Sequence, residues 1–208
     1  MFAHSNETGA SAIVRWLGIH RGFFHRTVAC FGEEHATFRP RENMLSVAGQ
    51  ILHSAVGLEV MLGTYLQSLP RFAGRRWVSP RGEAEGWAGS DKGLDDLGWT
   101  NASDGEPVKD EAVANSLEKS LAVLDATFEL FIQLFSEIPE AELNAPLVSK
   151  LYPPGANGWF VIEGAMDHTA HHRGALAQYA RLLGLSPKLP YFDIEEFAHE
   201  AMLERSAA

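Results

Sequence analysis

Three histidines near the carboxyl end of the chain have spacings that could bind a metal ion. His168 and His172 lie four residues apart, and His171 lies between them. Residues four apart share one face of a helix, with about 5–6 Å between their Cβ atoms, so two imidazoles at this spacing can bind one ion. His171 is turned by about 100° from His172 around the helix axis. We therefore expect His168 and His172 to be ligands and His171 to be the weaker candidate.

His53 is the candidate for a third ligand. It lies in an apolar helical segment, in line with Gly49, Val56 and Val60, and the small Gly49 could leave room for an ion or its water. Three neutral imidazoles leave coordination positions open on a divalent ion, as in catalytic zinc sites. A metal-bound water, with a pKa lowered toward about 7, would then be the catalytic group. The alternative is a hydrogen-bonded triad of core histidines without a metal, because buried imidazoles need partners in either case.

Further polar residues near these histidines have two interpretations each. Arg173 and Asp167 are possible catalytic helpers: Arg173 could bind an anionic substrate or form a structural salt bridge. Asp167 and Glu163 could orient a ligand imidazole, since metal-bound histidines usually donate their other N–H to an acceptor, or could lie on a solvated helix face. We expect Glu59 at the surface or in a dimer contact, and His20 as a hydrogen-bonded core histidine.

Apolar residues at alternating spacings of three and four predict the helices that carry these side chains. One helix is expected over residues 9–31 and a second over 43–67, where three glycines lower the intrinsic propensity, so that packing must hold it. A third follows residue 107 and ends before Pro139. The fourth contains His168 and His172, with Asn157 as its N-cap and Gly184 as its C-terminal stop.

The predicted elements are helical throughout, so the expected fold class is all-α. The long irregular connection over residues 70–106 holds Trp77, Trp87 and Trp99; it is expected to be a crossover between the second and third helices of a bundle, a lid over a pocket, or both. A short helix over 194–204 would belong to a peripheral tail, 190–208. We expect residues 1–208 to form one domain.

Composition restricts the class of protein. The 208 residues carry a formal net charge of −10, and a surface that repels phosphates makes nucleic acid an improbable partner. Cys30 is the only cysteine, which leaves no internal disulfide and fits a reducing compartment. No signal peptide and no run of about 18 apolar residues is present, so we expect a cytoplasmic protein with no membrane contact.

Two segments resemble the DinB-like superfamily of metal-dependent helical bundles. The stretch from Ser46 to Ala55 looks like the family's segment that ends near its first histidine. The stretch from Asp167 to Leu176, DHTAHHRGAL, is similar to the family's H-x-x-H-H-R-G-Q helix. Tyr179, Leu182, Gly184 and Pro187 match its tail, and the histidine spacing and helix order extend the resemblance over nearly the whole chain. Ala175 departs from the pattern, because a glutamine commonly follows Arg-Gly in the family.

This resemblance implies a four-helix bundle of up-down-down-up order, often a homodimer, that binds nickel or zinc through His53, His168 and His172. It also implies two chemistries on a small-molecule substrate: hydrolysis, or transfer of a low-molecular-weight thiol such as bacillithiol or mycothiol. The expected function is therefore that of a metal-dependent hydrolase or thiol S-transferase. The alternative is a non-catalytic dimeric bundle that binds metal or serves a structural role.

Overall fold

The computed structural model describes residues 9–75, 77, 79–80, 111–147 and 152–191, and all regular structure among them is helical. No strand is present in these ranges, so the expected all-α class is confirmed. The elements are the long helices α1 (Gly9–Val28), α2 (Val47–Ser68), α5 (Leu117–Phe135) and α7 (Gly158–Leu182), the short helices α4 (Glu111–Ala114) and α6 (Glu140–Asn144), and the 3-10 turns η1 (Glu33–His35) and η2 (Pro70–Phe72).

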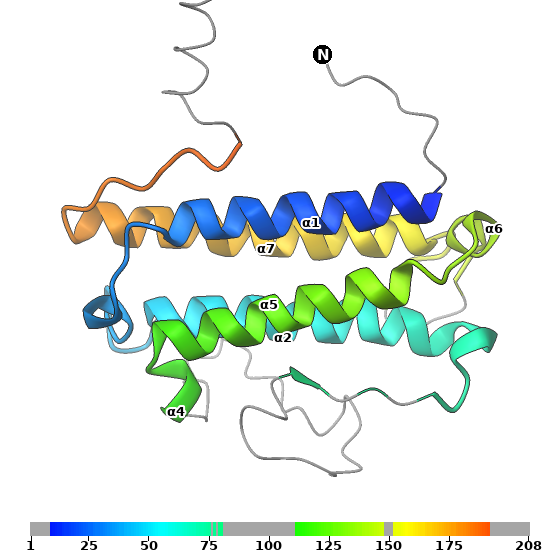
Figure 1. Ribbon diagram of the computed structural model, residues 1–208, viewed down its shortest axis with the longest axis horizontal. Helices are drawn as coiled ribbons and strands as arrows, with labels where there is room; N and C mark the ends of the chain where they lie inside the picture. The colour runs from blue at the N-terminus through cyan, green and yellow to red at the C-terminus, as the bar shows by residue number, and fades with distance from the viewer. Residues whose placement is uncertain (1–8, 76, 78, 81–110, 148–151, 192–208) are drawn as a thin grey trace, which may run out of the picture.

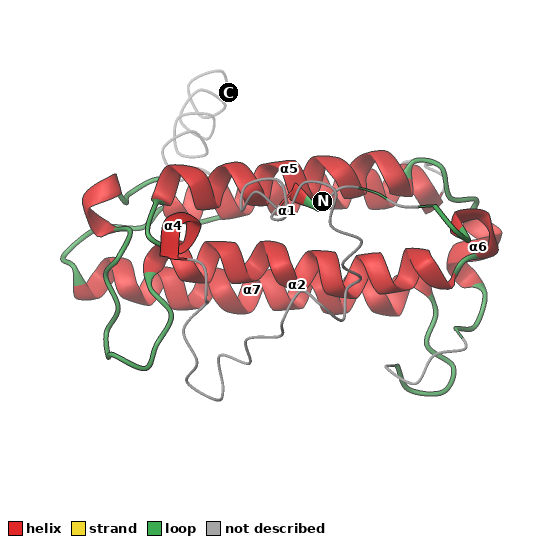
Figure 2. Ribbon diagram, turned by 90° about the horizontal axis from the view of Figure 1, so that it is seen from below, coloured by secondary structure: helices red, strands yellow, loops and turns green. Residues whose placement is uncertain are grey.

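The four long helices lie side by side around one core. Helix α2 packs against α5 and α7, and α1 packs against the same two helices. Figure 1 shows α1 beside α7 and α5 beside α2, and the turned view in Figure 2 shows α2 beside α7. Side chains that lose almost all solvent contact between them include Ile13, Leu17, Phe24, Ile51, Leu58, Leu62, Phe128, Phe131, Val161 and Leu176. Burial of this apolar surface is the main stabilising contribution to the bundle.

Each of the three long helices α2, α5 and α7 begins at a capping side chain. The Ser46 hydroxyl accepts the N–H of Gly49 at 3.0 Å, and the Ser116 hydroxyl accepts that of Lys119 at 3.2 Å. Asn157 accepts the N–H of Phe160 at 3.1 Å, as the sequence predicted. Such caps satisfy amide groups that have no partner inside the helix. Helix α7 ends before Gly184, whose φ of +76° favours glycine, again as predicted.

The predicted third helix is divided in two. Ser116 caps α5, while the chain before it forms α4, and the Ser120 hydroxyl of α5 donates to the carbonyl of Val113 at 2.8 Å. A further short helix, α6, follows Pro139 and was not predicted. The helix expected over 194–204 and most of the 70–106 connection, with Trp87 and Trp99, lie outside the described residues.

One end of the bundle joins several elements through hydrogen bonds. Two backbone amides at the start of α5, those of Leu117 and Glu118, donate to the Glu33 carboxylate at 3.1 and 3.0 Å. The Ser46 hydroxyl, just before α2, donates to the carbonyl of Ala114 at 3.2 Å. The turn between α1 and α2 is thereby attached to the segment that leads into α5.

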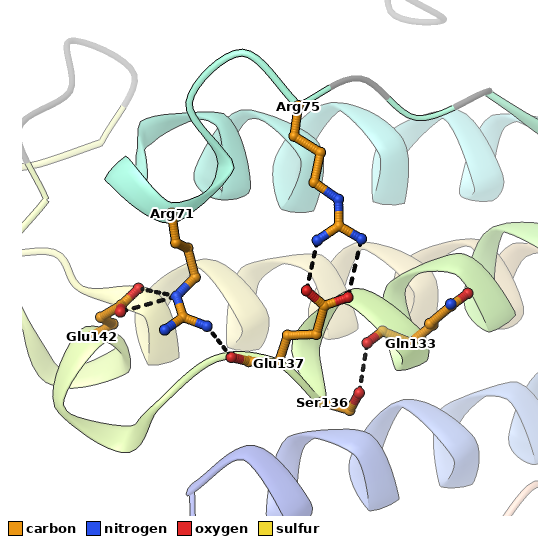
Figure 3. Close-up of polar contacts among 6 residues, drawn as sticks. All are labelled: Arg71, Arg75, Gln133, Ser136, Glu137 and Glu142. Carbon is orange, nitrogen blue, oxygen red and sulfur yellow. Dashed lines mark hydrogen bonds and ion pairs between the residues drawn. The ribbon is translucent and has the colours of Figure 1, made fainter.

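Ion pairs attach the segment after α2 to α6 and to the turn that precedes it (Figure 3). Arg75 forms a two-pronged pair with Glu137, at 2.6 and 3.0 Å, and Arg71 pairs with Glu142 at 2.9 Å. Hydrogen bonding to Arg75 lowers the pKa of Glu137. Beyond these pairs Trp77 packs against the core. The first part of the 70–106 connection therefore lies along the bundle.

No helix in the described ranges combines the length and apolar character needed to cross a membrane.

Candidate metal centre

The three predicted ligand histidines come together where α2 meets α7. His53 extends from α2, and His168 and His172 extend from α7. The ring centroid of His53 lies 5.3 Å from that of His168 and 4.8 Å from that of His172, and the two α7 rings are 4.6 Å apart. One nitrogen from each ring can be chosen so that all three lie within 4.8 Å of one another. Two helices distant in sequence thus present three nitrogen donors to one point.

These distances are compatible with a bound divalent ion. Ligands at about 2.1 Å in a tetrahedral arrangement are separated by about 3.4 Å, and Nε2 of His168 lies 3.2 Å from Nε2 of His172. Two ligands of one ion at this bond length can be no more than about 4.2 Å apart. A nitrogen pair near the 4.8 Å limit therefore needs a small ring rotation to close on an ion.

A chain of hydrogen bonds sets the tautomer of His172. The Tyr179 hydroxyl donates to the carbonyl of Leu45 at 3.2 Å, and the Gln50 amide N–H donates to the Tyr179 oxygen at 3.2 Å. The amide oxygen of Gln50 therefore faces Nδ1 of His172, at 2.5 Å. Since a carbonyl oxygen only accepts, Nδ1 must carry the proton. Nε2 of His172 is therefore an acceptor, and it accepts the Nε2–H of His168 at 3.2 Å.

The two α7 imidazoles are held in the neutral form. Burial, together with the neighbouring His168, His53 and His171, lowers the pKa of His172 to about 2. Burial also lowers the pKa of His168. A histidine must be unprotonated at the coordinating nitrogen to bind a metal, so neither α7 ring has to lose a proton from an imidazolium at neutral pH.

Gly57 makes room for the cluster. A Cβ on Gly57 would lie 2.2 Å from Cε1 and 2.4 Å from Nδ1 of His168, a spacing that real side chains do not tolerate. A Cβ on Gly49 would instead contact the Ser46 hydroxyl at 3.1 Å, at the helix cap. The close approach of a ring to α2 is therefore at Gly57, one turn beyond His53, and the expectation that Gly49 leaves room for an ion or its water stays a prediction.

The remaining residues near the α7 histidines lie apart from the cluster. His171, Asp167 and Glu163 are exposed, although the Asp167 charge still acts to raise the pKa of His168 against burial. His172 takes its acceptor from Gln50 on α2 instead. Arg173 is buried, and its guanidinium lies over the ring of Phe23 on α1.

Two sequence expectations outside the cluster are wrong. Glu59 is not at the surface: it is 2% exposed, and the Ser79 hydroxyl donates to its carboxylate at 2.7 Å. Glu59 is buried because most of α2 is packed in the core and because the chain after α2 contacts its carboxylate through Ser79. His20 is not a hydrogen-bonded core histidine, since it is half-buried and its Nδ1 has no partner among the described residues.

Sequence reasoning missed Gln50, Tyr179 and Gly57 as parts of the site. Gln50 precedes His53 by three residues and so shares its helix face, and it is a lone amide among apolar residues. A single amide on the helix face of a candidate ligand could therefore have identified Gln50 as part of the site. The pairing of Gln50 with Tyr179, 129 residues later, is a contact between helices that spacing along one helix cannot reveal.

Comparison with known proteins gives one result. Residues 18–176 match the family model described as DinB superfamily, a range that includes α2, α5 and all three clustered histidines. No curated protein matches, and no solved structure matches either.

Proposed function

Because this chain belongs to the DinB superfamily, we propose that it binds one divalent metal ion through His53, His168 and His172 and is a metal-dependent enzyme acting on a small molecule. The observation that supports the proposal most is the convergence of three imidazoles from α2 and α7. Gln50 adds to it by fixing the lone pair of His172 toward the other rings.

The donor set favours nickel or zinc, since imidazole suits both ions. Within the described ranges the cluster holds three side chains and no fourth ligand, an arrangement typical of sites with open coordination positions. When bound, such an ion supplies Lewis acidity to a substrate group and activates a nucleophile at neutral pH. Two reactions fit, hydrolysis and transfer of a low-molecular-weight thiol.

The residues of the chain contribute orientation and limited access to solvent. His172 is buried, whereas His53 and His168 are half-buried, so solvent reaches part of these two residues. Gln50 and Tyr179 hold the buried ring, and Gly57 allows the ring of His168 to approach α2. A substrate would approach over the two half-buried rings. Asp167, which is exposed beside His168, is the remaining candidate helper.

The proposal extends to the domain organisation, helix order, oligomeric state and location of the protein. We infer one domain over residues 1–208, an up-down-down-up order of the long helices, a homodimer and a cytoplasmic location. Two contacts support the helix order: Glu33 binds the start of α5, and Tyr179 near the end of α7 binds Leu45 just before α2. The net charge of −10 supports a partner other than nucleic acid.

Elemental analysis of protein purified without a histidine tag tests the metal site. We expect close to one divalent ion per chain in the wild type and a loss of most of it in His172→Ala. His171→Ala, which changes an exposed neighbour on the same helix, should keep the wild-type content. Equal metal content in the His172→Ala protein would show that the assigned ligands are wrong.

Activity screens of the metal-loaded protein separate the two reactions. Consumption of an electrophilic substrate only when bacillithiol or mycothiol is present would identify a thiol transferase, while turnover without a thiol would identify a hydrolase. The non-catalytic alternative predicts neither activity. It also predicts an ion with no exchangeable water, which water-proton relaxation of the nickel form measures.

A further inference from the structure

The guanidinium of Arg173 is buried without a carboxylate partner. The residue is 4% exposed, and its Nε has no hydrogen-bond acceptor among the residues that the structure describes. No ion pair joins it to an Asp or Glu within those ranges. Burying an unpaired cation is expensive, so arginines in such positions normally lie against an anion.

Two aromatic rings cover the faces of this guanidinium and leave its edge available. The central carbon of the Arg173 guanidinium lies 5.3 Å from the centroid of Phe23, on α1, and 5.8 Å from that of Tyr191, after α7. The Tyr191 side chain also hydrogen-bonds to the guanidinium, but Nε, which points outward in the plane of the group, has no acceptor in the described part of the chain. The edge that includes Nε is the one that binds a carboxylate or phosphate through two parallel hydrogen bonds.

His20 provides a second unpaired nitrogen beside Arg173. Its Nδ1 is buried and has no partner in the described part of the chain, and its ring lies 5.5 Å from that of Phe23, the ring that also contacts Arg173. Burial and the charge of Arg173 lower the pKa of His20 to about 4. The imidazole is therefore neutral and can donate one N–H, while the positive charge stays on Arg173.

A water molecule could satisfy one of these nitrogens but would not balance the charge. An oxoanion does both, because it accepts hydrogen bonds and is negatively charged. Tyr191, one of the two rings over the guanidinium, is itself 63% exposed. It belongs to the segment after α7, drawn in orange, that turns back along the α1–α7 side of the bundle (Figure 1).

We propose that Arg173 and His20 form a binding site for a small oxoanion, a phosphate or carboxylate group, between α1 and α7. Arg173 binds it with the Nε edge of the guanidinium, and His20 donates one hydrogen bond. The site is distinct from the histidine cluster, because His172 faces α2 whereas Arg173, one residue later, faces α1, about 100° around the helix. It does not depend on the proposed metal.

Titration with inorganic phosphate, followed by the ring resonances of His20 in NMR spectra at pH 7.5 and constant ionic strength, tests the proposal. His20→Asn identifies these resonances. We expect saturable shifts with a Kd of about 1 mM or tighter for the wild type, and binding at least tenfold weaker for Arg173→Gln. Arg173→Lys keeps the charge without the planar fork and should also bind several-fold more weakly. A parallel titration with acetate shows whether the site takes carboxylates as well.

Two controls keep the outcomes distinct. Arg181→Gln removes an exposed arginine from the same helix, two turns further on, and should bind phosphate like the wild type. His53→Ala disables the proposed metal site and should also leave phosphate binding unchanged, which separates the two proposals. Absence of saturable His20 shifts in the wild type, or equal affinity in wild type and Arg173→Gln, would overturn the oxoanion site. Arg173 would then be held by its contacts with Phe23 and Tyr191.

Discussion

Gln50 determines which nitrogen of His172 can bind a metal. The chain of donors and acceptors ends at the carbonyl of Leu45, which can only accept, and this end fixes the direction of every hydrogen bond back to His172. Burial raises the pKa of Tyr179, so its hydroxyl keeps the proton that it donates. The orientation of His172 thus depends on residues that would never contact the ion.

Replacing Gln50 by alanine should weaken metal binding by about 10- to 100-fold, the usual effect of losing the hydrogen-bond partner of a ligand histidine. The buried N–H of His172 would also be left unpaired, at a cost of about 1–3 kcal/mol in the free energy of unfolding. Competition with a chromophoric chelator measures the affinity. Gln50→Glu restores an acceptor and should recover most of the binding.

Gln67→Ala is the matched control for this prediction, because Gln67 lies on the same helix and is exposed. It should change neither affinity nor stability. A Gln50→Ala protein that holds its metal as tightly as the wild type would mean that Gln50 does not orient the ligand.

At Gly57 a single substitution has opposite expected effects on metal binding and on helix stability. Gly57→Ala should weaken metal binding at least tenfold, because the new Cβ would occupy the space of the His168 ring. Chelator competition again measures the affinity. An alanine within a helix is intrinsically favoured over glycine by about 1 kcal/mol, so any stability lost in this variant comes from displacement of that ring.

Gly22 on α1 provides the comparison, since nothing lies within 4 Å of a Cβ placed there. Gly22→Ala should raise the free energy of unfolding by about 0.5–1 kcal/mol and leave the metal affinity unchanged. The space argument would be wrong if the two alanine variants behaved alike.

At the level of elements, Glu33 attaches the turn between α1 and α2 to the start of α5. Its carboxylate accepts the backbone N–H groups of Leu117 and Glu118, where a negative charge also interacts favourably with the helix dipole. The hydrogen bond from the Ser116 side chain, followed by the one from the Glu118 amide, lowers the pKa of Glu33 below its ordinary value of 4.5.

This depressed pKa gives a pH dependence of known sign. Because the folded pKa is below the unfolded one, the stabilisation is complete above about pH 4.5 and is lost as the pH falls through the folded value. Glu33→Gln should therefore lower Tm by about 1–4 °C at pH 7 and make little difference in strong acid. Thermal unfolding across this pH range measures both.

Glu34→Gln is the control for Glu33, since the Glu34 side chain is 74% exposed and its carboxylate lies 3.7 Å from Nδ1 of His35 in the same turn. Its Tm should follow that of the wild type at every pH. A Glu33→Gln defect that persists unchanged in acid would exclude the carboxylate as its cause.

The elements that sequence periodicity predicts well are those whose ends are set by nearby residues. Helix α7 begins at Asn157 and ends before Gly184 as expected, because both signals act within one turn. The division between α4 and α5 was missed because no proline or glycine separates them; Ser116, a favoured N-cap residue, was the local signal of the break and was overlooked. The pairing of Gln50 with His172 and Tyr179 was missed because these partners lie on another helix.

At the scale of the whole molecule, the three histidines would let one ion tie α2 to α7. The two helices are far apart in sequence, and their contact is one side of the four-helix core. The unfolded chain cannot hold the three imidazoles at one point. Metal binding should therefore stabilise the entire fold and not only the site.

Removing the metal with a chelator should consequently lower Tm. With free metal at about 100 times its Kd, the bound ion contributes about 2.7 kcal/mol, which corresponds to about 5–11 °C in a chain of this size. Differential scanning calorimetry with and without chelator measures the shift, and it should be absent in His53→Ala, where the link to α2 is broken. If the chelator lowered the Tm of His53→Ala as much as that of the wild type, the stabilising metal would be bound elsewhere in the molecule.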